Sequence, residues 1–369
     1  MQKLLFTAAS LALCAVAASA QTTFVYDLVQ SSSNFTWSGT SSLGNIVGNP
    51  SNQFQLAGTT NLDLVLQSGA QPYASAAFSG GSAAAVPDLH GRINNPFPFL
   101  PPLATIDVNG LVISPSSPSF TVGAGGAFTG SMTLTALAGT LVVTPLGSAP
   151  TNTPLAGSSS APAAVSGTLT LSGGALRLNT PVNSTFAFSD PTSGASGTIT
   201  VVGTVVGQYP LVRSYCAGDG SGIACPCGNT APANSGRGCL NSTGVGGLLA
   251  TSGSPVVTAD TLALVGSGMP ASASVLYFQG TAQSGGGAGT IFGDGKRCTS
   301  GSVIRVGTKT NVAGSSSYPS GGDPVISVRG AVPAAGATRT YQAWYRNSAV
   351  FCTLDGFNLT NGLSVTWIP

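Results

Sequence analysis

The chain has 369 residues, and only 6% of them are charged, with 12 Lys and Arg balanced by 10 acidic residues, all of which are Asp. Soluble proteins usually carry about 25% charged residues, and amphipathic helices need Glu, Lys and Leu in quantity. The composition therefore argues against a helical protein, and the scattered basic residues argue against a nucleic-acid-binding protein. The abundance of Gly, Ser, Thr and Val predicts an all-β fold.

Residues 1–20 have the three regions of a cleavable export signal. Lys3 supplies the positive start, an apolar run spans residues 4–16, and the small residues 18–20 form the cleavage site. We therefore expect a mature chain that begins at Gln21 and is secreted, either extracellular or at the cell surface. No later segment approaches the ~20 apolar residues of a membrane-spanning helix, so we expect no membrane span.

Residues 21–212 carry the pattern of a β-rich domain. Short runs alternate apolar side chains with Thr or Arg, which is typical of a strand with one buried face. These runs span residues 131–136, 168–171, 175–178 and 198–201. Segments rich in Gly, Ser and Pro separate them, so we predict antiparallel strands in a β-sandwich or barrel-like domain.

Residues 94–102 (Asn-Asn-Pro-Phe-Pro-Phe-Leu-Pro-Pro) form the most unusual local sequence of this domain. The four prolines hold the segment extended, so that Phe97 and Phe99 can form an exposed aromatic platform for a ligand or partner. The alternative is a crossover loop that places both rings in the core. Because buried aromatic rings are the norm, we predict the core position.

The chain has a single histidine, His90, two residues after Asp88. Both side chains can face the same way on a strand and bind a metal ion. Two ligands without a third are weak evidence for such a site. We therefore predict a solvent-exposed loop histidine and no metal or other cofactor.

The charge balance divides the chain in two. Residues 21–212 contain two Arg and five Asp, a net charge of −3, whereas residues 213–369 contain nine Lys and Arg and five Asp, a net charge of +4. All cysteines after the export signal lie in the second part. We therefore predict a boundary near residue 212 and a Cys-rich C-terminal β domain over residues 213–369.

Six cysteines of this second domain are predicted to form three disulfides, because exported thiols tend to pair. They are Cys216, Cys225, Cys227, Cys239, Cys298 and Cys352. A zinc site built from the first four is the alternative. Six cysteines allow 15 connectivities. Our prediction joins Cys298 to Cys352 and places the other four in two local bridges.

Asp219 and Asp294 each lie in a Gly-rich loop that invites a calcium interpretation. A calcium site needs six or more oxygen ligands, usually from several carboxylates, and each loop offers one Asp. We predict that both are turn residues. Whether a calcium ion lies near either of them is left open by the sequence.

Residues 339–346 alternate in the manner of a strand. Tyrosines occupy one face, and the other face carries Gln342, Trp344 and Arg346. If the tyrosine face is buried, these three residues form an exposed polar and aromatic strip suited to a glycan. If the tryptophan face is buried, the strip is structural, and we favour this interpretation because Trp is usually well buried.

Several short motifs lie between residues 215 and 369. They are CPCGN at 225–229, GCLNS at 238–242, FGDGKRC at 292–298, YQAWYR at 341–346, FNLTN at 357–361 and SVTW at 364–367. Together they resemble a C-terminal module that recurs in secreted bacterial proteins of unknown function. The resemblance implies an extracellular disulfide module joined to varied N-terminal partners, with no catalytic residues. The chain departs from the family pattern at Asn347, where an acidic residue often stands.

The sequence favours a non-catalytic role. It has no carboxylate pair linked by a recognisable motif and no Gly-x-Ser-x-Gly elbow, and its mature cysteines are even in number, as expected of exported thiols that pair. Our leading hypothesis is an extracellular structural or surface-associated protein that assembles or adheres, through self-association or other surface proteins. The alternative is a glycan-binding protein, and a hydrolase is the least favoured reading.

Overall fold

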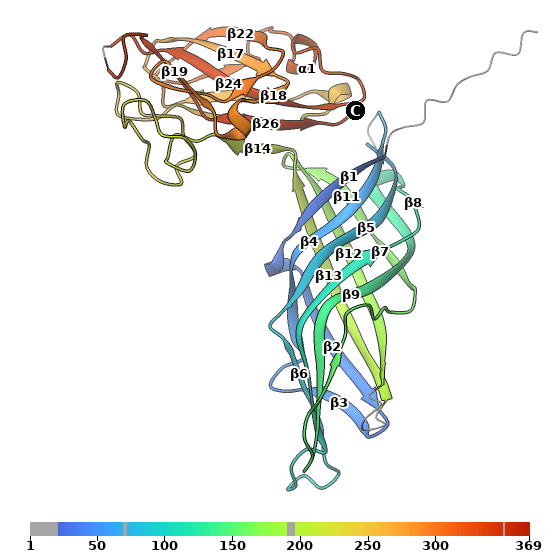
Figure 1. Cartoon of the computed structure of the whole chain (residues 1–369). Helices are drawn as coiled ribbons and strands as arrows, with labels where there is room; N and C mark the ends of the chain where they lie inside the picture. The colour runs from blue at the N-terminus through green and yellow to red at the C-terminus, as the bar shows by residue number, and fades with distance from the viewer. Residues whose placement is uncertain (1–20, 69–71, 190–195, 350) are drawn as a thin grey trace, which may run out of the picture.

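A computed structural model describes residues 21–68, 72–189, 196–349 and 351–369 (Figure 1). Strands hold 59% of the residues and helices only 5%, so the predicted all-β fold class is confirmed. The strands form large antiparallel sheets, and three disulfides lie in the C-terminal region. The described residues include no helix with the length and apolar character of a membrane span.

Thirteen of the described strands form one antiparallel sheet, which we call the N-terminal body. They are β1 (Gln21–Leu28), β2 (Asn34–Ser41), β3 (Gly44–Gly48), β4 (Gln53–Leu66), β5 (Tyr73–Val86), β6 (Leu89–Ile93), β7 (Ala104–Ser116), β8 (Phe120–Thr121), β9 (Ala127–Pro145), β10 (Thr151–Pro154), β11 (Ala163–Ser172), β12 (Ala175–Ser189) and β13 (Ser196–Pro210). Two short 3-10 helices, η1 (Gln30–Ser32) and η2 (Ala124–Gly126), lie between strands.

The sheet of the N-terminal body closes on itself in a long, twisted shape (Figure 1). Eight strands pair in a complete ring in the order β1, β4, β5, β7, β9, β11, β12 and β13, and β13 pairs with β1 again. β2, β3 and β6 form a further part of the wall between β13 and β7. Closure reduces the number of open strand edges, which limits edge-to-edge aggregation.

Alternation along these strands fills the interior with apolar side chains. On β4, Phe54, Leu56, Leu62 and Leu64 are at most 4% exposed, while their sequence neighbours lie nearer to solvent. The four runs predicted from alternation lie in β9, β11, β12 and β13. Glycine makes room for one large ring, because a Cβ at Gly91 would lie 2.4 Å from the Trp37 indole.

The other strands form the C-terminal body. They are β14 (Val212–Tyr215), β15 (Leu248–Ser252), β16 (Ala263–Ser267), β17 (Ser274–Gly280), β18 (Ala282–Gln283), β19 (Thr290–Phe292), β20 (Gly295–Arg297), β21 (Thr299–Ser300), β22 (Ile304–Thr310), β23 (Ser316–Tyr318), β24 (Ala337–Arg346), β25 (Phe357–Leu359) and β26 (Gly362–Trp367). The helices are η3 (Val257–Ala259), η4 (Ser284–Gly287) and α1 (Ile326–Arg329).

The main sheet of the C-terminal body runs β14-β26-β24-β17-β22, and β25 pairs with β24. A second sheet runs β15-β16-β23. Side chains from both sheets form one apolar core, in which Tyr277, Tyr341, Tyr345 and Trp367 from the main sheet pack with Leu264 from the second. Large aromatic rings therefore supply much of the buried surface of this body.

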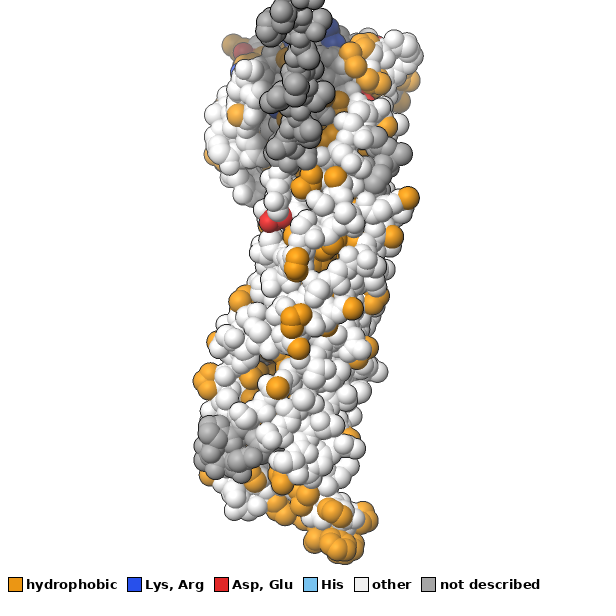
Figure 2. Space-filling view, turned by 90° about the vertical axis from the view of Figure 1, so that its right-hand side faces the viewer, with side chains coloured by type: hydrophobic (Ala, Val, Ile, Leu, Met, Phe, Trp, Pro, Cys, Tyr) orange, Lys and Arg blue, Asp and Glu red, His pale blue; other side chains and the backbone are white. Residues whose placement is uncertain are grey.

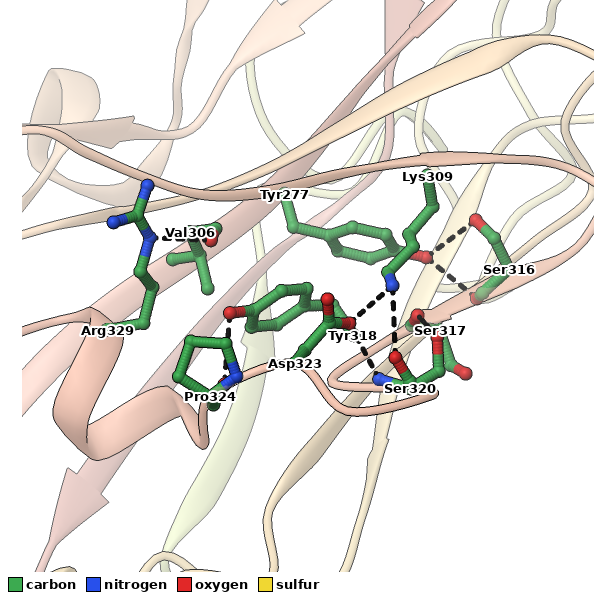
Figure 3. A network of polar contacts seen from close by, with 10 residues as sticks. All are labelled: Tyr277, Val306, Lys309, Ser316, Ser317, Tyr318, Ser320, Asp323, Pro324 and Arg329. Atoms are coloured by element: carbon green, nitrogen blue, oxygen red, sulfur yellow. Dashed lines mark hydrogen bonds and ion pairs between the residues drawn. The ribbon is translucent and has the colours of Figure 1, made fainter.

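A network of polar contacts fastens the loop that follows β23 (Figure 3). Lys309 forms an ion pair with Asp323 and donates to the Ser320 carbonyl at 3.2 Å. The Tyr318 hydroxyl donates to the Pro324 carbonyl at 3.0 Å. The Lys309 ammonium also lies 5.7 Å from the centre of the Tyr318 ring. These contacts hold the loop against β22 and β23.

The two bodies meet at one end of the closed sheet (Figure 1). The Arg213 guanidinium lies 3.9 Å from the Asp27 carboxylate and 5.2 Å from the centre of the Tyr209 ring. Val256 and Ile368 of the C-terminal body pack into the apolar cluster of the N-terminal body. Because the ion pair is solvent-exposed, the apolar contacts contribute more to this junction.

Candidate functional site

Three disulfides hold the irregular segment that opens the C-terminal body. They join Cys216 to Cys298, Cys225 to Cys239 and Cys227 to Cys352. All six predicted cysteines are paired, but the predicted Cys298–Cys352 bridge is wrong and only one bridge is local. The reason is the path of the chain: Cys298 follows β20 and lies with its Cα 5.9 Å from that of Cys216, whereas Cys352 lies beside Cys227.

Buried amide side chains satisfy the backbone of this irregular segment. Asn229 Nδ2 donates to the carbonyls of Leu240 and Asp294 at 2.7 and 2.8 Å. Asn361 Nδ2 donates to the Leu249 carbonyl at 3.1 Å. Asn229 and Asn361 end the CPCGN and FNLTN motifs, so these motifs supply hydrogen bonds that no strand provides.

Gln342, predicted as part of a ligand strip, is fully buried. Its Oε1 accepts from the Cys298 backbone N at 2.8 Å, and its Nε2 donates to the carbonyls of Lys296 and Thr360 at 2.8 and 2.7 Å. Gln342 therefore ties β20 and the β25–β26 connection to β24. Its amide has no access to an external ligand, so the favoured structural interpretation is correct at Gln342, and Gln342 is not part of a ligand strip.

Replacement of Gln342 by Leu is expected to lower the free energy of unfolding by about 3 kcal/mol, because three buried backbone groups lose their partners. Gln283→Leu is the matched control, since Gln283 is an exposed glutamine of the same body. That control should change stability by less than about 0.5 kcal/mol. Urea denaturation of both variants measures the difference, and equal values would contradict the structural role of Gln342.

The other two residues of the predicted strip remain accessible. Trp344 is half-buried and Arg346 is exposed, with its guanidinium 5.5 Å from the indole centre. Tyr341 and Tyr345 on the opposite face are fully buried. The interpretation that buries the tryptophan face in place of the tyrosine face is therefore wrong. At Gln342 both faces of strand β24 are buried. Nearer to Trp344 the outer face of the strand is exposed to solvent.

Trp344 forms a wall of a depression on the outer face of the main sheet, with a volume of about 370 Å³. The depression is lined by Leu276, Phe278, Phe292, Arg297, Val303, Arg305, Trp344 and Leu359. The Phe357 ring supports two of its walls, with its centre 5.4 Å from that of Trp344 and 4.8 Å from that of Phe292. We call this site the aromatic depression.

The aromatic depression combines apolar surface with positive charge. Phe278 and Leu359 are buried, whereas Arg305 is exposed. Arg297 donates its Nε to the Thr299 carbonyl at 2.9 Å, which fixes the direction of its guanidinium. None of the described lining residues is acidic. The site therefore suits a ligand with a flat apolar face and with polar or anionic groups at its edge.

Asp294 lies in a turn, as predicted, and Asp219 lies in a bend, where its carboxylate accepts from the Ser221 backbone N. The Asp294 carboxylate is fully buried and accepts from Asn347 Nδ2 at 2.8 Å and from the Thr353 backbone N at 2.7 Å. Hydrogen bonds from Ser221 to the Asp219 carboxylate lower the pKa of Asp219. In the described parts of the chain, no three or more His, Cys, Asp or Glu residues gather as metal ligands.

His90 is exposed, as predicted, but it lies on strand β6 and not on a loop. Its Nδ1 is 2.8 Å from Asp107 Oδ1 on β7. Asp88 Oδ1 accepts from the Gly110 backbone N at 2.8 Å. Asp88 and His90 therefore have separate partners and do not form a common site.

The prediction that Phe97 and Phe99 lie in the core is wrong. Their side chains are 60% and 81% exposed, and their ring centres are 6.0 Å apart. The segment is not extended as predicted, because Phe97 to Leu100 form a turn in a loop that projects beyond the closed sheet, whose interior is already filled by strand residues. The segment forms the exposed aromatic platform that was the alternative.

No family model, curated protein or solved structure matches this chain. The chemistry of the aromatic depression is therefore argued from its geometry. Sequence reasoning identified Trp344 but missed Phe278, Phe292 and Arg305, which reach the site from β17, β19 and β22. Only Phe292 carried a signal, because it opens the FGDGKRC motif.

Proposed function

We propose that the chain is a secreted, non-catalytic protein of the cell surface or extracellular matrix that adheres through its C-terminal body. The aromatic depression carries this proposal, because it offers a rigid contact surface and hydrogen-bond donors without a carboxylate for proton transfer. Three disulfides support an oxidising compartment. The resemblance of residues 215–369 to a module of secreted proteins agrees with this location.

A glycan is the ligand class that the aromatic depression favours. Its volume of about 370 Å³ lies within the range of small-molecule sites. The apolar face of a sugar ring can stack against the part of the Trp344 indole that lines the depression. The guanidinium groups of Arg297 and Arg305 can donate to hydroxyl or carboxylate oxygens. A glycan that carries a uronate or sulfate group matches this charge best.

A glycan array of neutral and acidic sugars, probed with the oxidised chain from Gln21 onward, tests the proposal. Trp344→Ala is expected to weaken binding at least tenfold, since the stacking surface is lost. Arg305→Ala should weaken the binding of acidic glycans more than that of neutral glycans, and it should reduce the salt dependence of binding. Arg177→Ala, at an exposed arginine of β12, is the matched control and should leave binding unchanged.

Self-association is the other form of the structural hypothesis, and a net charge near zero weakly favours it. Light scattering across a concentration series distinguishes the two. Ordered oligomers, together with no binding on the glycan array, would support self-association as the function and contradict adhesion to a glycan. A strict monomer that binds a defined sugar and loses it in Trp344→Ala would establish the binding function.

A further inference from the structure

The end of the N-terminal body far from the C-terminal body is apolar. It is formed by the loop that joins β6 to β7 and by the turn that follows β9 (Figure 1). Phe97, Phe99, Leu100 and Leu146 are 60%, 81%, 46% and 53% exposed there. Leu146 N donates to the Leu103 carbonyl at 2.8 Å, which joins the two segments. Figure 2 shows hydrophobic side chains gathered at this lower end. We call these four exposed side chains the apolar tip.

The loop that carries the apolar tip is held in one shape. Asn95 Oδ1 accepts from the Phe97 backbone N at 3.1 Å, and Asn95 Nδ2 donates to the Pro101 carbonyl at 3.3 Å. Leu100 N donates to the Phe97 carbonyl at 3.0 Å. The two phenyl rings are therefore presented together before any partner arrives, which lowers the entropic cost of binding.

Backbone donors are scarce on this loop. Four of its residues lack an N–H group, namely Pro96, Pro98, Pro101 and Pro102. The N–H groups of Phe97 and Leu100 are already paired within the loop. Fewer free N–H groups lower the cost of moving the loop from water towards lipid, because an unpaired donor loses its hydrogen bonds to water there.

The apolar tip also lacks charge. The nearest charged residues in sequence are Arg92 and Asp107 on either side of the loop, and the residues from 142 to 152 contain none. No ion pair or basic cluster of the loop therefore selects a charged partner. The tip differs in this respect from the aromatic depression, where arginines line the site.

The exposed area decides between a protein and a lipid partner. Four partly exposed side chains of this size offer on the order of 400 Å², about half of the ~800 Å² that each protein buries in a stable complex. A convex, uncharged tip has no complementary groove to offer a second copy. Insertion into a bilayer interface needs no complementary shape, only apolar area.

We propose that the apolar tip inserts into the interfacial region of a lipid bilayer and anchors the N-terminal body there. The contact is hydrophobic, so zwitterionic and anionic lipids bind equally and added salt has little effect. This inference goes beyond the proposed adhesion, because it concerns another body and another ligand. The molecule then has two separate contact sites, one for lipid and one for a glycan.

Flotation of the oxidised chain from Gln21 onward with phosphatidylcholine vesicles tests this proposal. Residues 1–20 are left out because their apolar run would bind lipid itself. The double variant Phe97→Ser/Phe99→Ser is expected to bind at least tenfold less than the wild type. Phe97→Leu/Phe99→Leu keeps the apolar area and should retain most of the binding. Leu354→Ser, at a side chain 97% exposed on the C-terminal body, is the matched control.

Three outcomes would overturn the proposal. The first is wild-type protein that stays with the vesicle-free fraction. The second is binding that requires phosphatidylglycerol and disappears at high salt, which would mean that arginines bind the anionic headgroups. The third is a concentration-dependent dimer that the serine double variant abolishes, which would make a second copy the partner. Both phenylalanines are exposed, so the thermal unfolding of each variant should match that of the wild type and verify its fold.

Discussion

Reduction of the three disulfides is expected to unfold the C-terminal body while the N-terminal body stays folded. Residues 216–247, which open the C-terminal body, contain no extended strand. Buried amides and two disulfides, Cys216–Cys298 and Cys227–Cys352, attach this segment to the rest of the body, and Cys225–Cys239 cross-links the segment itself. The N-terminal body contains no cysteine among its described residues and depends on its closed sheet and apolar core. Reducing agent should therefore act on one body only.

The lengths of the loops that the disulfides close determine how much stability is lost on reduction. Their sequence separations are 14, 82 and 125 residues. The chain-entropy estimate gives about 3 kcal/mol for the shortest loop and about 4.5 to 5 kcal/mol for each of the two longer ones. A whole domain is usually stable by only about 5–15 kcal/mol. Loss of the two long cross-links is therefore enough to unfold the C-terminal body.

Hydrogen exchange read by mass spectrometry separates the two bodies, because each gives its own peptides. Peptides from β24 and β26 should lose protection after reduction, and peptides from β4 and β12 should keep theirs. The paired variant Cys227→Ser/Cys352→Ser should destabilise more than Cys225→Ser/Cys239→Ser, which opens only the short loop. Simultaneous loss of protection in both bodies would contradict this prediction and would mean that they unfold as one unit.

The alternation of apolar residues in the sequence predicted the strands, but it did not predict that their sheet closes into a ring. Alternation at residues 131–136 and 175–178 identified strands with one buried face, and both are observed in β9 and β12. Ring closure depends on pairs such as Asp27 with Gln208, which are far apart in sequence. Such pairing follows from the summed twist and stagger of all the strands, so no local run of residues encodes it.

The candidate site shows the same limit. Alternation placed Gln342 and Trp344 on one face of a strand, which is correct, but it does not show what covers that face. Segments around Lys296 and Thr360 fold over Gln342, and the cover ends before Trp344. The disulfide pairing failed for the same reason, because it follows the path of an irregular segment. Its course is set by buried amides and not by periodicity.

Alkaline pH is expected to unfold both bodies. Burial raises the pKa of Tyr26 and Tyr73 in the N-terminal body, and of Tyr341 and Tyr345 in the C-terminal body. A tyrosine in an unfolded chain ionises near pH 10. The folded state therefore binds these phenol protons more tightly than the unfolded state does. The stability from this source is complete below about pH 10 and falls as the pH rises further.

The slope of this loss is large. Each tyrosine that is ionised only in the unfolded state lowers stability by about 1.4 kcal/mol per pH unit. Two such tyrosines in one body therefore lower it by almost 3 kcal/mol per pH unit. Lys296 acts in the opposite direction, because burial lowers the pKa of its ammonium and a rise in pH removes the cost of its charge. One lysine with a gain that ends near pH 10.4 does not offset tyrosines whose effect begins there.

Two tyrosine variants make the alkaline prediction specific. Among the described groups, none forms a hydrogen bond with the buried Tyr26 hydroxyl. Tyr26→Phe should therefore raise stability at pH 7 by about 1 kcal/mol and move the alkaline midpoint of the N-terminal body upward. Tyr345→Phe loses the 3.2 Å bond from Asn241 Nδ2 and should lower stability at pH 7 by a similar amount.

The two variants separate two effects on stability: the burial of a hydroxyl at pH 7, and the ionisation of that hydroxyl above pH 10. Both variants remove one alkaline proton release, so both should show a shallower fall in stability above pH 10 in their own body. They should differ in sign at pH 7, because only the Tyr345 hydroxyl has a partner. Urea denaturation at pH 7 and across the alkaline range measures both effects. A loss of stability in Tyr26→Phe at pH 7 would show that its hydroxyl is bonded and would contradict this prediction.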